Sequence, residues 1–487
     1  MHGALSRPAA NRKGIAMKTT AKKPTVKTGK SKRCGTEAPL REIRDDVAGI
    51  DIGALEEYVS CRPNPDGSPN VKVFSTDTES LNELADWLAA CGIHSVAMES
   101  TGVYWIPLYQ ILVAREIEVV LVDARSLKGV PGRKTDVIDC QWLRQLHACG
   151  LLKGCFLPDD PTASLRALLR MRQTLRREQD DWIRRLQKQL EMMNVRVHRA
   201  VSDITGVTGM AIVRAIVAGE RNPVVLARLR DRRCRKSEAE IARELTGDWR
   251  EEHLFNLALA LETYDHFAAE IAKVDQRITT FLSQLKAKRE AEGKPTCTTA
   301  PAHPSPRKGA RFVERGEEPL RKSLVETFGV DLTQIDGIGV ETAAGIFMEL
   351  GPDVPIHFQT EDKFAAYLRL APNLGISGGH PVRGKKAPRR GMPPLKRLLL
   401  TAAATMRISE TPLGDYYRKT AFRRGAGIAV FATAGKIARR IYRALAFGVE
   451  YAIGGDEKWR QANKERQIAR LSRLAASLGH TLVPAEA

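Results

Sequence analysis

The sequence predicts an α/β domain near the N-terminus, followed by mostly helical regions. Short apolar runs bounded by turn-forming residues indicate three strands, at residues 47–52, 57–61 and 71–74. Helical and strand patterns then alternate along the chain, with helices at 80–91, 104–115 and 136–149 and strands at 95–99 and 118–122. Three strands followed by alternating helices and strands is the order of a ribonuclease-H-like α/β fold, here at residues 46–160.

Composition and charge favour a protein that faces nucleic acid. The 487 residues leave room for two or three domains, and 77 Lys and Arg against 57 Asp and Glu give a net charge of +20. Only 28% of the residues are charged, which is typical of a globular basic protein and not of a disordered polycation. Ribosomal and membrane-surface proteins are also basic, but the chain has no run of 18 apolar residues that would span a bilayer.

The cysteines and the N-terminus indicate a cytoplasmic protein. The eight cysteines are scattered, without paired Cys-x-x-Cys motifs or His clusters, which argues against zinc fingers and a disulfide framework. Residues 1–45 lack the apolar segment of a signal peptide and are rich in Lys, Thr, Ala and Gly. We interpret them as a disordered basic arm.

Two long apolar stripes predict amphipathic helices in a helical region at residues 161–285. One stripe runs from Leu165 to Val197 and the other from Leu257 to Leu285, with charged residues between the apolar ones. The stripes favour an antiparallel coiled-coil hairpin or a dimer seam. Two ordinary helices of a bundle explain the same pattern equally well.

The C-terminal part is predicted to be a mostly helical domain at residues 323–454, after a linker or insertion at 286–322 and before a charged tail helix at 455–487. The segment Ile335-Asp-Gly-Ile-Gly resembles a helix-hairpin-helix motif. In such a motif, Gly337 and Gly339 let backbone amides approach a phosphate at a helix N-terminus. A plain turn between helices is an equally simple interpretation of this pattern.

Four carboxylates are the candidate metal ligands. Asp51 and Glu99 each end a predicted strand, while Asp136 and Asp139 lie three apart at the start of a predicted helix. Each alone has a structural explanation as a turn residue or a helix cap. Together they supply the converging carboxylates that a two-metal site for phosphodiester chemistry requires, with Mg²⁺ as the expected ion and Mn²⁺ as a substitute.

A serine on a glycine-rich loop is the candidate nucleophile. Ser377 is followed by two glycines and His380, so its backbone can approach a phosphate closely. Basic residues that could bind DNA and stabilise negative charge follow it, namely Arg383, Lys385, Lys386, Arg389, Arg390, Lys396 and Arg397. In isolation, Ser377 reads as a turn residue and His380 as a solvated loop histidine.

Several motifs, in order, resemble those of the IS110-type transposases (the IS110/IS1111/IS116/IS902 group). The blocks Gly-Ile-Asp-Ile-Gly, Met-Glu-Ser-Thr-Gly-Val-Tyr-Trp and Arg-Lys-Thr-Asp-Val-Ile-Asp-Cys resemble the acidic domain of that family. The Asp-Gly-Ile-Gly hairpin, the Leu-Ala-Pro segment with Ser-Gly-Gly, and Lys-Arg-Leu-Leu-Leu-Thr-Ala-Ala resemble its C-terminal domain. The similarity extends from about Val47 to Tyr451; the basic arm and the segment after Lys286 depart from the compact form of the family.

The resemblance implies a DNA transposase with a RuvC-like acidic domain. Its Asp-Glu-Asp-Asp quartet for Mg²⁺ falls on the four carboxylates, and its nucleophilic serine falls on Ser377. The family implies a covalent serine–DNA intermediate, double-stranded donor and target DNA, a structured guide RNA and a homo-oligomer, dimer or tetramer, that shares the site between subunits. A bacterial protein that associates with the nucleoid when active is the corresponding expectation.

Two other functions fit the same residues. A RuvC-like, Mg²⁺-dependent Holliday-junction nuclease would use activated water as the nucleophile and would not need Ser377. A basic nucleic-acid scaffold with a degenerate nuclease fold would need none of the carboxylates, and an intact quartet argues against it, because like charges held together repel.

Overall fold

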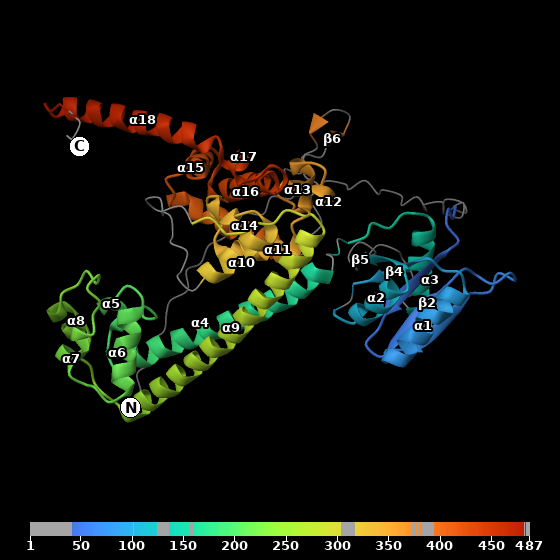
Figure 1. Cartoon of the computed structure of the whole chain (residues 1–487), viewed down its shortest axis with the longest axis horizontal. Helices are drawn as coiled ribbons and strands as arrows, with labels where there is room; N and C mark the ends of the chain where they lie inside the picture. The colour runs from blue at the N-terminus through green and yellow to red at the C-terminus, as the bar shows by residue number, and fades with distance from the viewer. Residues whose placement is uncertain are drawn as a thin grey trace, which may run out of the picture. The chain divides into compact units, whose positions relative to one another are not determined.

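The protein forms two compact units that divide after Cys155 (Figure 1). The structure, a computed structural model, describes residues 41–100, 102–123, 136–155, 157, 160–302, 317–371, 376–377, 380–381, 394–481 and 483. Each unit has its own core and is described separately.

The first unit is built on a five-stranded mixed sheet in the order β3-β2-β1-β4-β5. The strands are β1 (Val47–Ile52), β2 (Glu56–Ser60), β3 (Val71–Ser75), β4 (Ser95–Glu99) and β5 (Glu118–Val122). The first three strands form an antiparallel meander, and β4 and β5 run parallel to β1. This topology confirms the predicted ribonuclease-H-like fold, and the predicted bounds of β1, β4 and β5 match the observed ones.

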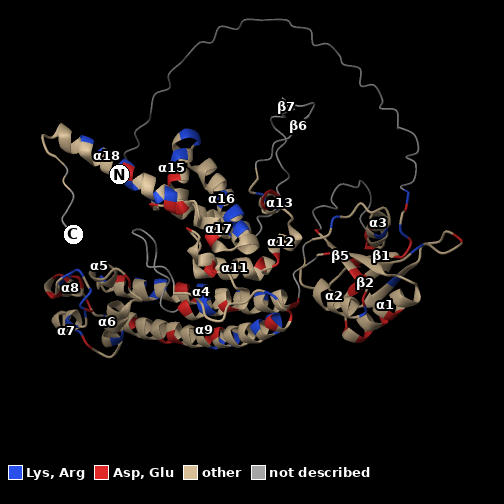
Figure 2. Ribbon diagram, turned by 45° about the horizontal axis from the view of Figure 1, so that its top comes forward, with Lys and Arg blue, Asp and Glu red and all other residues tan. Residues whose placement is uncertain are grey.

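Three helices cover the sheet. Helices α1 (Thr78–Ala90) and α2 (Trp105–Ala114) lie on one face, and α3 (Asp136–Ala148) lies on the other (Figure 2). Residues such as Ile50 on the sheet, Leu84 on α1 and Leu108 on α2 are fully buried. Apolar burial of this kind stabilises the unit by roughly 25 cal/mol for each Å² of apolar surface removed from water.

Helix α3 crosses β1 so closely that only glycine fits beneath it. A Cβ atom at Gly49 would lie 2.3 Å from the backbone nitrogen of Arg144 and 2.4 Å from the carbonyl oxygen of Cys140. Backbone atoms on both sides of the contact leave no flexible group that could move away. Gly49 therefore sets the distance between α3 and the sheet.

One carboxylate is buried inside the sheet. The Glu57 side chain is 1% exposed, and its Oε2 has no hydrogen-bond partner among the described residues. A hydrogen bond from the Gly53 backbone partly compensates for burial, but burial and the nearby charge of Asp51 raise the pKa of Glu57 to about 8. Glu57 is therefore mostly protonated at neutral pH.

The second unit begins with a long antiparallel helix pair. Helices α4 (Asp160–Met192) and α9 (Glu251–Ala291) lie side by side along most of their length (Figure 1). The predicted stripes therefore pair with each other within one chain, as an antiparallel hairpin. Buried Arg172 on α4 reinforces the pair, because it donates to Asp275 on α9 at 2.5 Å and to Glu341 on the following helical domain.

A small helical cap closes one end of this coiled coil. It consists of α5 (Val197–Ala200), α6 (Val207–Val217), α7 (Pro223–Arg228) and α8 (Glu238–Glu244). Its hydrophobic core is separate from the core of the C-terminal helices and includes Leu186 and Leu190 of α4 and Leu257 of α9. We call α5 to α8 and their connections the cap.

The C-terminal helices gather at the other end of the coiled coil. They comprise α10 (Glu318–Phe328), η1 (Leu332–Gln334), α11 (Val340–Leu350), α12 (Val354–His357), α13 (Glu361–Tyr367), α14 (Pro394–Thr405), η2 (Met406–Ile408), α15 (Pro412–Arg424), α16 (Ala426–Phe447), α17 (Val449–Ile453) and α18 (Asp456–Ser477). Two short strands, β6 (Ile376–Ser377) and β7 (His380–Pro381), form a hairpin in this region. Helix α16 buries one face and contacts α13, α14, α15 and α17.

Part of the predicted linker at 286–322 is helical. Helix α9 continues to Ala291, and α10 already begins at Glu318. The extension is stabilised by Arg289, which is buried and donates to the carbonyl oxygens of Thr327 (3.1 Å) and Pro295 (3.2 Å). These bonds join segments far apart in sequence, so the local composition did not predict them.

Among the described residues, none of the helices is both long enough and apolar enough to span a membrane.

Replacing Gly49 by alanine is expected to destabilise the first unit by about 1–3 kcal/mol, the usual effect of overpacking a tight contact. The added methyl group must push α3 away from β1, because it meets backbone atoms. Thermal unfolding of the full chain measures the change. Gly154→Ala is the matched control, since its Cβ would make an ordinary 3.5 Å contact with Val120. Equal melting temperatures for the two variants would contradict this account.

Replacing Glu57 by glutamine is expected to remove a pH dependence of stability. The folded-state pKa of about 8 lies above the ordinary value of 4.5, so the bound proton stabilises the fold fully below pH 4.5. This stability is lost as the pH rises to about 8, by up to about 1.4 kcal/mol per pH unit.

Urea unfolding between pH 5 and 9 compares wild type with Glu57→Gln. The control is Glu56→Gln, at an exposed neighbour that accepts a hydrogen bond from Tyr58 at 2.9 Å. We expect Glu57→Gln to gain stability relative to wild type at pH 8–9. An unchanged pH profile would show that Glu57 is ionised in the folded state.

Candidate active site

Helix α3 runs opposite in direction to β1 and β4. Its last turn is anchored at the start of β4, where the Ser95 hydroxyl and His147 Nε2 are 2.8 Å apart. Its middle rests on Gly49 of β1. The N-terminus of α3, which carries Asp136 and Asp139, therefore lies toward the carboxyl ends of these strands.

Asp51 and Glu99 lie at the same level of the sheet. Strands β1 and β4 are parallel and pair Ile50 with Met98, so the next residue on each strand is one of the two carboxylates. Residues two apart on a strand point to the same face, and Gly49 faces α3. Asp51 therefore projects from the face that α3 covers, and so does its neighbour Glu99.

The pKa values of neighbouring side chains reflect the negative charge around Asp51. Cys140, one residue beyond Asp139 on α3, is buried, and this burial together with the charges of Asp51 and Asp139 raises the pKa of its thiol to about 12. The Tyr58 hydroxyl pairs with Glu56, and that hydrogen bond, with a smaller contribution from Asp136, raises the pKa of Tyr58. The carboxylates Asp51 of β1 and Asp139 of α3 thus both act on Cys140.

The carboxylates match a hard divalent cation in kind. Asp51 and Glu99 are half-buried, Asp139 is half-buried and Asp136 is exposed. Carboxylate oxygens are the donors that Mg²⁺ and Mn²⁺ favour. In the described part of the chain, however, no three His, Cys, Asp or Glu side chains are placed so that they could already hold one ion. The elements bring the four carboxylates to one edge of the sheet, without closing a metal site.

The helix-hairpin-helix-like segment lies between η1 and α11. Gly337 adopts a left-handed conformation with φ of 86°, which favours glycine, and a Cβ there would lie 3.0 Å from Cε of Met406. Gly339 is the N-cap of α11 and has open space around its Cα. No side chain of the N-cap residue caps the backbone amides at the start of α11, and phosphate binding there stays a prediction.

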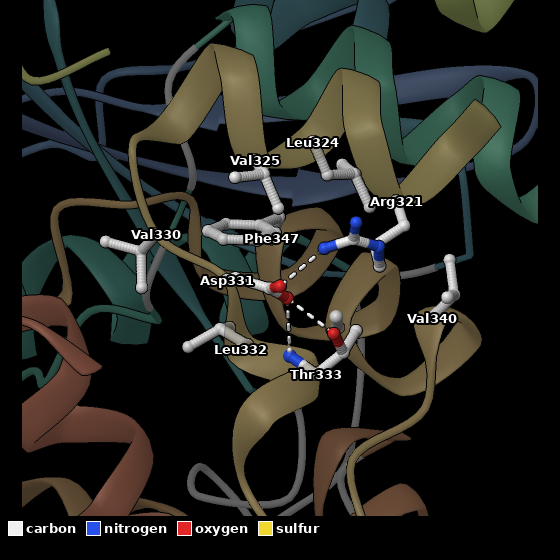
Figure 3. A pocket seen from close by; sticks show the side chains of 10 residues that line it. Arg321, Leu324, Val325, Val330, Asp331, Leu332, Thr333, Val340 and Phe347 are labelled. Carbon is white, nitrogen blue, oxygen red and sulfur yellow. Dashed lines mark hydrogen bonds and ion pairs between the residues drawn. The ribbon is translucent and has the colours of Figure 1, made fainter. Parts of the chain in front are cut away.

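A buried ion pair lies just before this segment in the chain. The Arg321 guanidinium donates to Asp331 at 2.5 Å, and Asp331 also accepts from the Thr333 backbone at 3.0 Å (Figure 3). Phe347 and Leu324 line the same small pocket. Since these polar groups satisfy one another, the pocket acts as a structural support of η1 and offers no ligand site.

The backbone of Ser377 lies in the β6–β7 hairpin, where it pairs with His380. The predicted nucleic-acid contacts Arg383, Lys385, Lys386, Arg389 and Arg390 lie outside the described residues. Arg397 is exposed on α14, and its contact with nucleic acid stays a prediction. Lys396 instead donates to the Arg369 carbonyl oxygen at 2.9 Å, and burial lowers its pKa, which indicates a structural role.

Three features of the first unit that support the candidate site were not predicted from the sequence. Glu57, Gly49 and the Ser95–His147 pair depend on contacts between segments that are distant in the chain. For Glu57 the strand pattern held a signal, because Glu57 is two residues before the buried Val59 and shares its face. Burial also lowers the pKa of His147, so its ring is a neutral partner for Ser95.

Comparison with protein families matches two regions of the chain. A family model described as a transposase, of the IS110 type with an Asp-Glu-Asp-Asp motif, matches residues 48–195. A second model, described as the transposase IS116/IS110/IS902 family, matches residues 330–418. A search of curated proteins finds no match.

The two matched regions coincide with the parts that carry the candidate site. The first spans the whole sheet, α3 and all four carboxylates, and the second spans the helix-hairpin-helix-like segment and Ser377. Both models describe transposases of one group, and they match in the order that the motifs predict. The chain therefore belongs to the IS110-type transposases.

Proposed function

We propose that this transposase cuts and rejoins DNA through a covalent bond between Ser377 and DNA. The proposal rests on one observation above all, the presence in one chain of both family regions, with four carboxylates gathered at one edge of the first. DNA processing follows from the family, and the net charge of +20 suits a polyanionic substrate. The serine intermediate, the metal and the guide RNA are the finer parts of the proposal.

In the proposed reaction, the Ser377 hydroxyl oxygen forms a bond to a backbone phosphorus. One bond from that phosphorus to a deoxyribose oxygen breaks, the serine proton passes to a base, and the leaving oxygen takes up a proton. A serine hydroxyl is a weak nucleophile at neutral pH, so removal of its proton must be assisted. Rejoining reverses the sequence with a different deoxyribose oxygen as the attacking group.

The carboxylates Asp51, Glu99, Asp136 and Asp139 would hold Mg²⁺ or Mn²⁺ on the first unit. Once bound, such an ion offsets the negative charge of the phosphate oxygens. The chain contributes carboxylate oxygens from two strand ends and one helix start. Because no three of these groups are yet placed to hold an ion, we propose that DNA and metal close the site together.

We further propose that a structured guide RNA selects the DNA and that several copies of the chain assemble on it. The guide RNA and the oligomer are implied by the family resemblance. The net charge of +20 is consistent with two nucleic-acid partners. Division of nucleophile and carboxylates between subunits would keep the single chain inactive until DNA assembles the complex.

A covalent adduct tests the serine step. Protein, candidate guide RNA, Mg²⁺ and labelled donor and target DNA should yield a denaturant-resistant protein–DNA adduct in wild type. We expect no adduct with Ser377→Ala, and a loss of at least about 10²-fold with Asp51→Asn, the order expected when a group that stabilises charge in the transition state is lost. Ser283→Ala, at an exposed serine of α9, is the control and should react like wild type.

The same assay distinguishes the proposed function from the alternative. Metal-dependent cleavage without an adduct, unchanged by Ser377→Ala, would indicate a RuvC-like junction nuclease that uses activated water. An adduct that survives Asp51→Asn at full yield would remove the carboxylates from the proposed reaction.

Mixed assemblies test the shared site. Ser377→Ala and Asp51→Asn chains of different size, each inactive alone, are expected to recover adduct formation when co-assembled. The adduct should form only on the Asp51→Asn chain, because that chain keeps Ser377. Absence of recovery, with mixed assembly confirmed by co-purification, would place both groups in one subunit.

A further inference from the structure

The cap carries a strongly basic loop that no part of the proposed site uses. The last residue of α7 and the connection to α8 together carry six Lys and Arg side chains within residues 228–236, against a single carboxylate, Asp231. It lies outside both regions that carry the candidate site residues, and also outside both family matches. Its charge density far exceeds that of the whole chain.

Backbone and side-chain hydrogen bonds hold this loop in one conformation. The backbone N–H of Asp231 donates to Thr208 Oγ1 of α6 at 2.9 Å, and the Asp231 carboxylate accepts from the backbone of Arg233 at 2.9 Å. Arg230 donates to the carbonyl oxygen of Lys236 at 2.7 Å, which closes the loop. A loop ordered in advance loses little entropy when it binds a ligand.

Three of its arginines are exposed to solvent and form no ion pair among the described residues. Arg228, Arg232 and Arg235 are exposed, and no ion pair joins any of them to an acidic group among the described residues. Arg233 differs, because Asp231 holds it at 2.7 Å, and Arg230 lies 3.7 Å from Glu238. The lone carboxylate of the loop is therefore occupied, and the three exposed charges are left for an external anion.

The cap lies well away from the C-terminal helices. Leu169 of α4 belongs to the core of those helices and Leu186 to the core of the cap. At 1.5 Å per residue, α4 rises about 25 Å between them. A duplex carries one phosphate charge per roughly 1.7 Å of its axis, so a nucleic acid held at the C-terminal helices can extend far enough to reach the cap.

We propose that Arg228, Arg232 and Arg235 bind the phosphate backbone of a nucleic acid, as an anchoring site separate from Ser377 and the carboxylates. The inference rests on the proposed function only in that nucleic acid is the partner. A repeating polyanion matches three separated guanidinium groups, each able to hold two phosphate oxygens. Contacts to phosphates carry no sequence information, so we expect this site to bind without sequence preference.

Salt dependence of binding tests the proposal directly. The full chain is titrated onto a duplex DNA or a structured RNA, in EDTA, between 50 and about 300 mM salt. In EDTA no metal-assisted cleavage occurs, so a failure of the catalytic proposal does not affect this result. The triple variant Arg228→Gln/Arg232→Gln/Arg235→Gln should weaken binding about tenfold or more at 0.1 M salt and make the salt slope for duplex DNA shallower by about 2.7.

Two further variants separate a local site from loss of net charge. The control variant Arg177→Gln/Arg184→Gln/Arg277→Gln removes an equal number of positive charges, from exposed positions on α4 and α9. It should leave the salt slope of binding unchanged. Arg228→Lys/Arg232→Lys/Arg235→Lys keeps the charges of the loop and should retain the wild-type slope. Circular dichroism melts check that all three proteins stay folded.

The two nucleic acids identify the ligand. A slope change with duplex DNA alone assigns the loop to DNA, and a change with RNA alone assigns it to RNA; either result supports the site. If the salt slope changes equally in the loop variant and in the α4–α9 control, the effect comes from net charge alone, and the proposal is overturned. An unchanged slope in the loop variant with both nucleic acids would overturn it as well.

Discussion

The missing side chain of Gly49 determines where α3 can lie, and the arrangement of the carboxylates follows from it. Contact between the backbone of α3 and β1 brings the helix as close to the sheet as two backbones can come. The Ser95–His147 contact at the opposite end then sets the direction of the helix. With both constraints in place, the two aspartates that begin α3 face the strand ends that carry Asp51 and Glu99.

Electrostatics around Asp51 differ from those of the rest of this basic protein. Glu57 and Cys140 are both buried, and both have raised pKa values to which Asp51 contributes. Glu57 belongs to the opposite face of the sheet from Asp51, since it pairs with Ile52, so the field of Asp51 acts across the sheet. For both groups burial is the larger cause of the shift, and the charge of Asp51 adds to it.

The second unit uses its arginines in two ways. Inside, Arg172, Arg321 and Arg440 form ion pairs that join different elements, and the partners Arg172 and Asp275 are 103 residues apart in the sequence. Arg321 and its partner Asp331 are almost fully buried, and removal of either partner would leave an uncompensated charge in the interior. Outside, Arg228, Arg232 and Arg235 of the cap are exposed and form no such ion pair among the described residues.

Most of the fold was predictable because its signals are local. The strand patterns, the amphipathic stripes of α4 and α9 and the tail helix each follow from residue periodicity, and the predicted strand β4 matches the observed one at both ends. The four carboxylates were also predictable as candidates, since each ends a strand or starts a helix. The ends of α9 and α10 were not, because Arg289 extends the helix through bonds to residues outside the local segment.

The sequence by itself therefore determined the order of the elements, the basic character of the chain and the transposase motifs. Only the tertiary structure decided that the two stripes pair within one chain, that Gly49 seats α3 and that Glu57 is buried without its full set of hydrogen bonds. It also decided which arginines are used internally and which remain free to bind. The physical reason is that burial and pairing depend on the partner that a residue meets in space, and periodicity along the chain specifies only the face on which a residue lies.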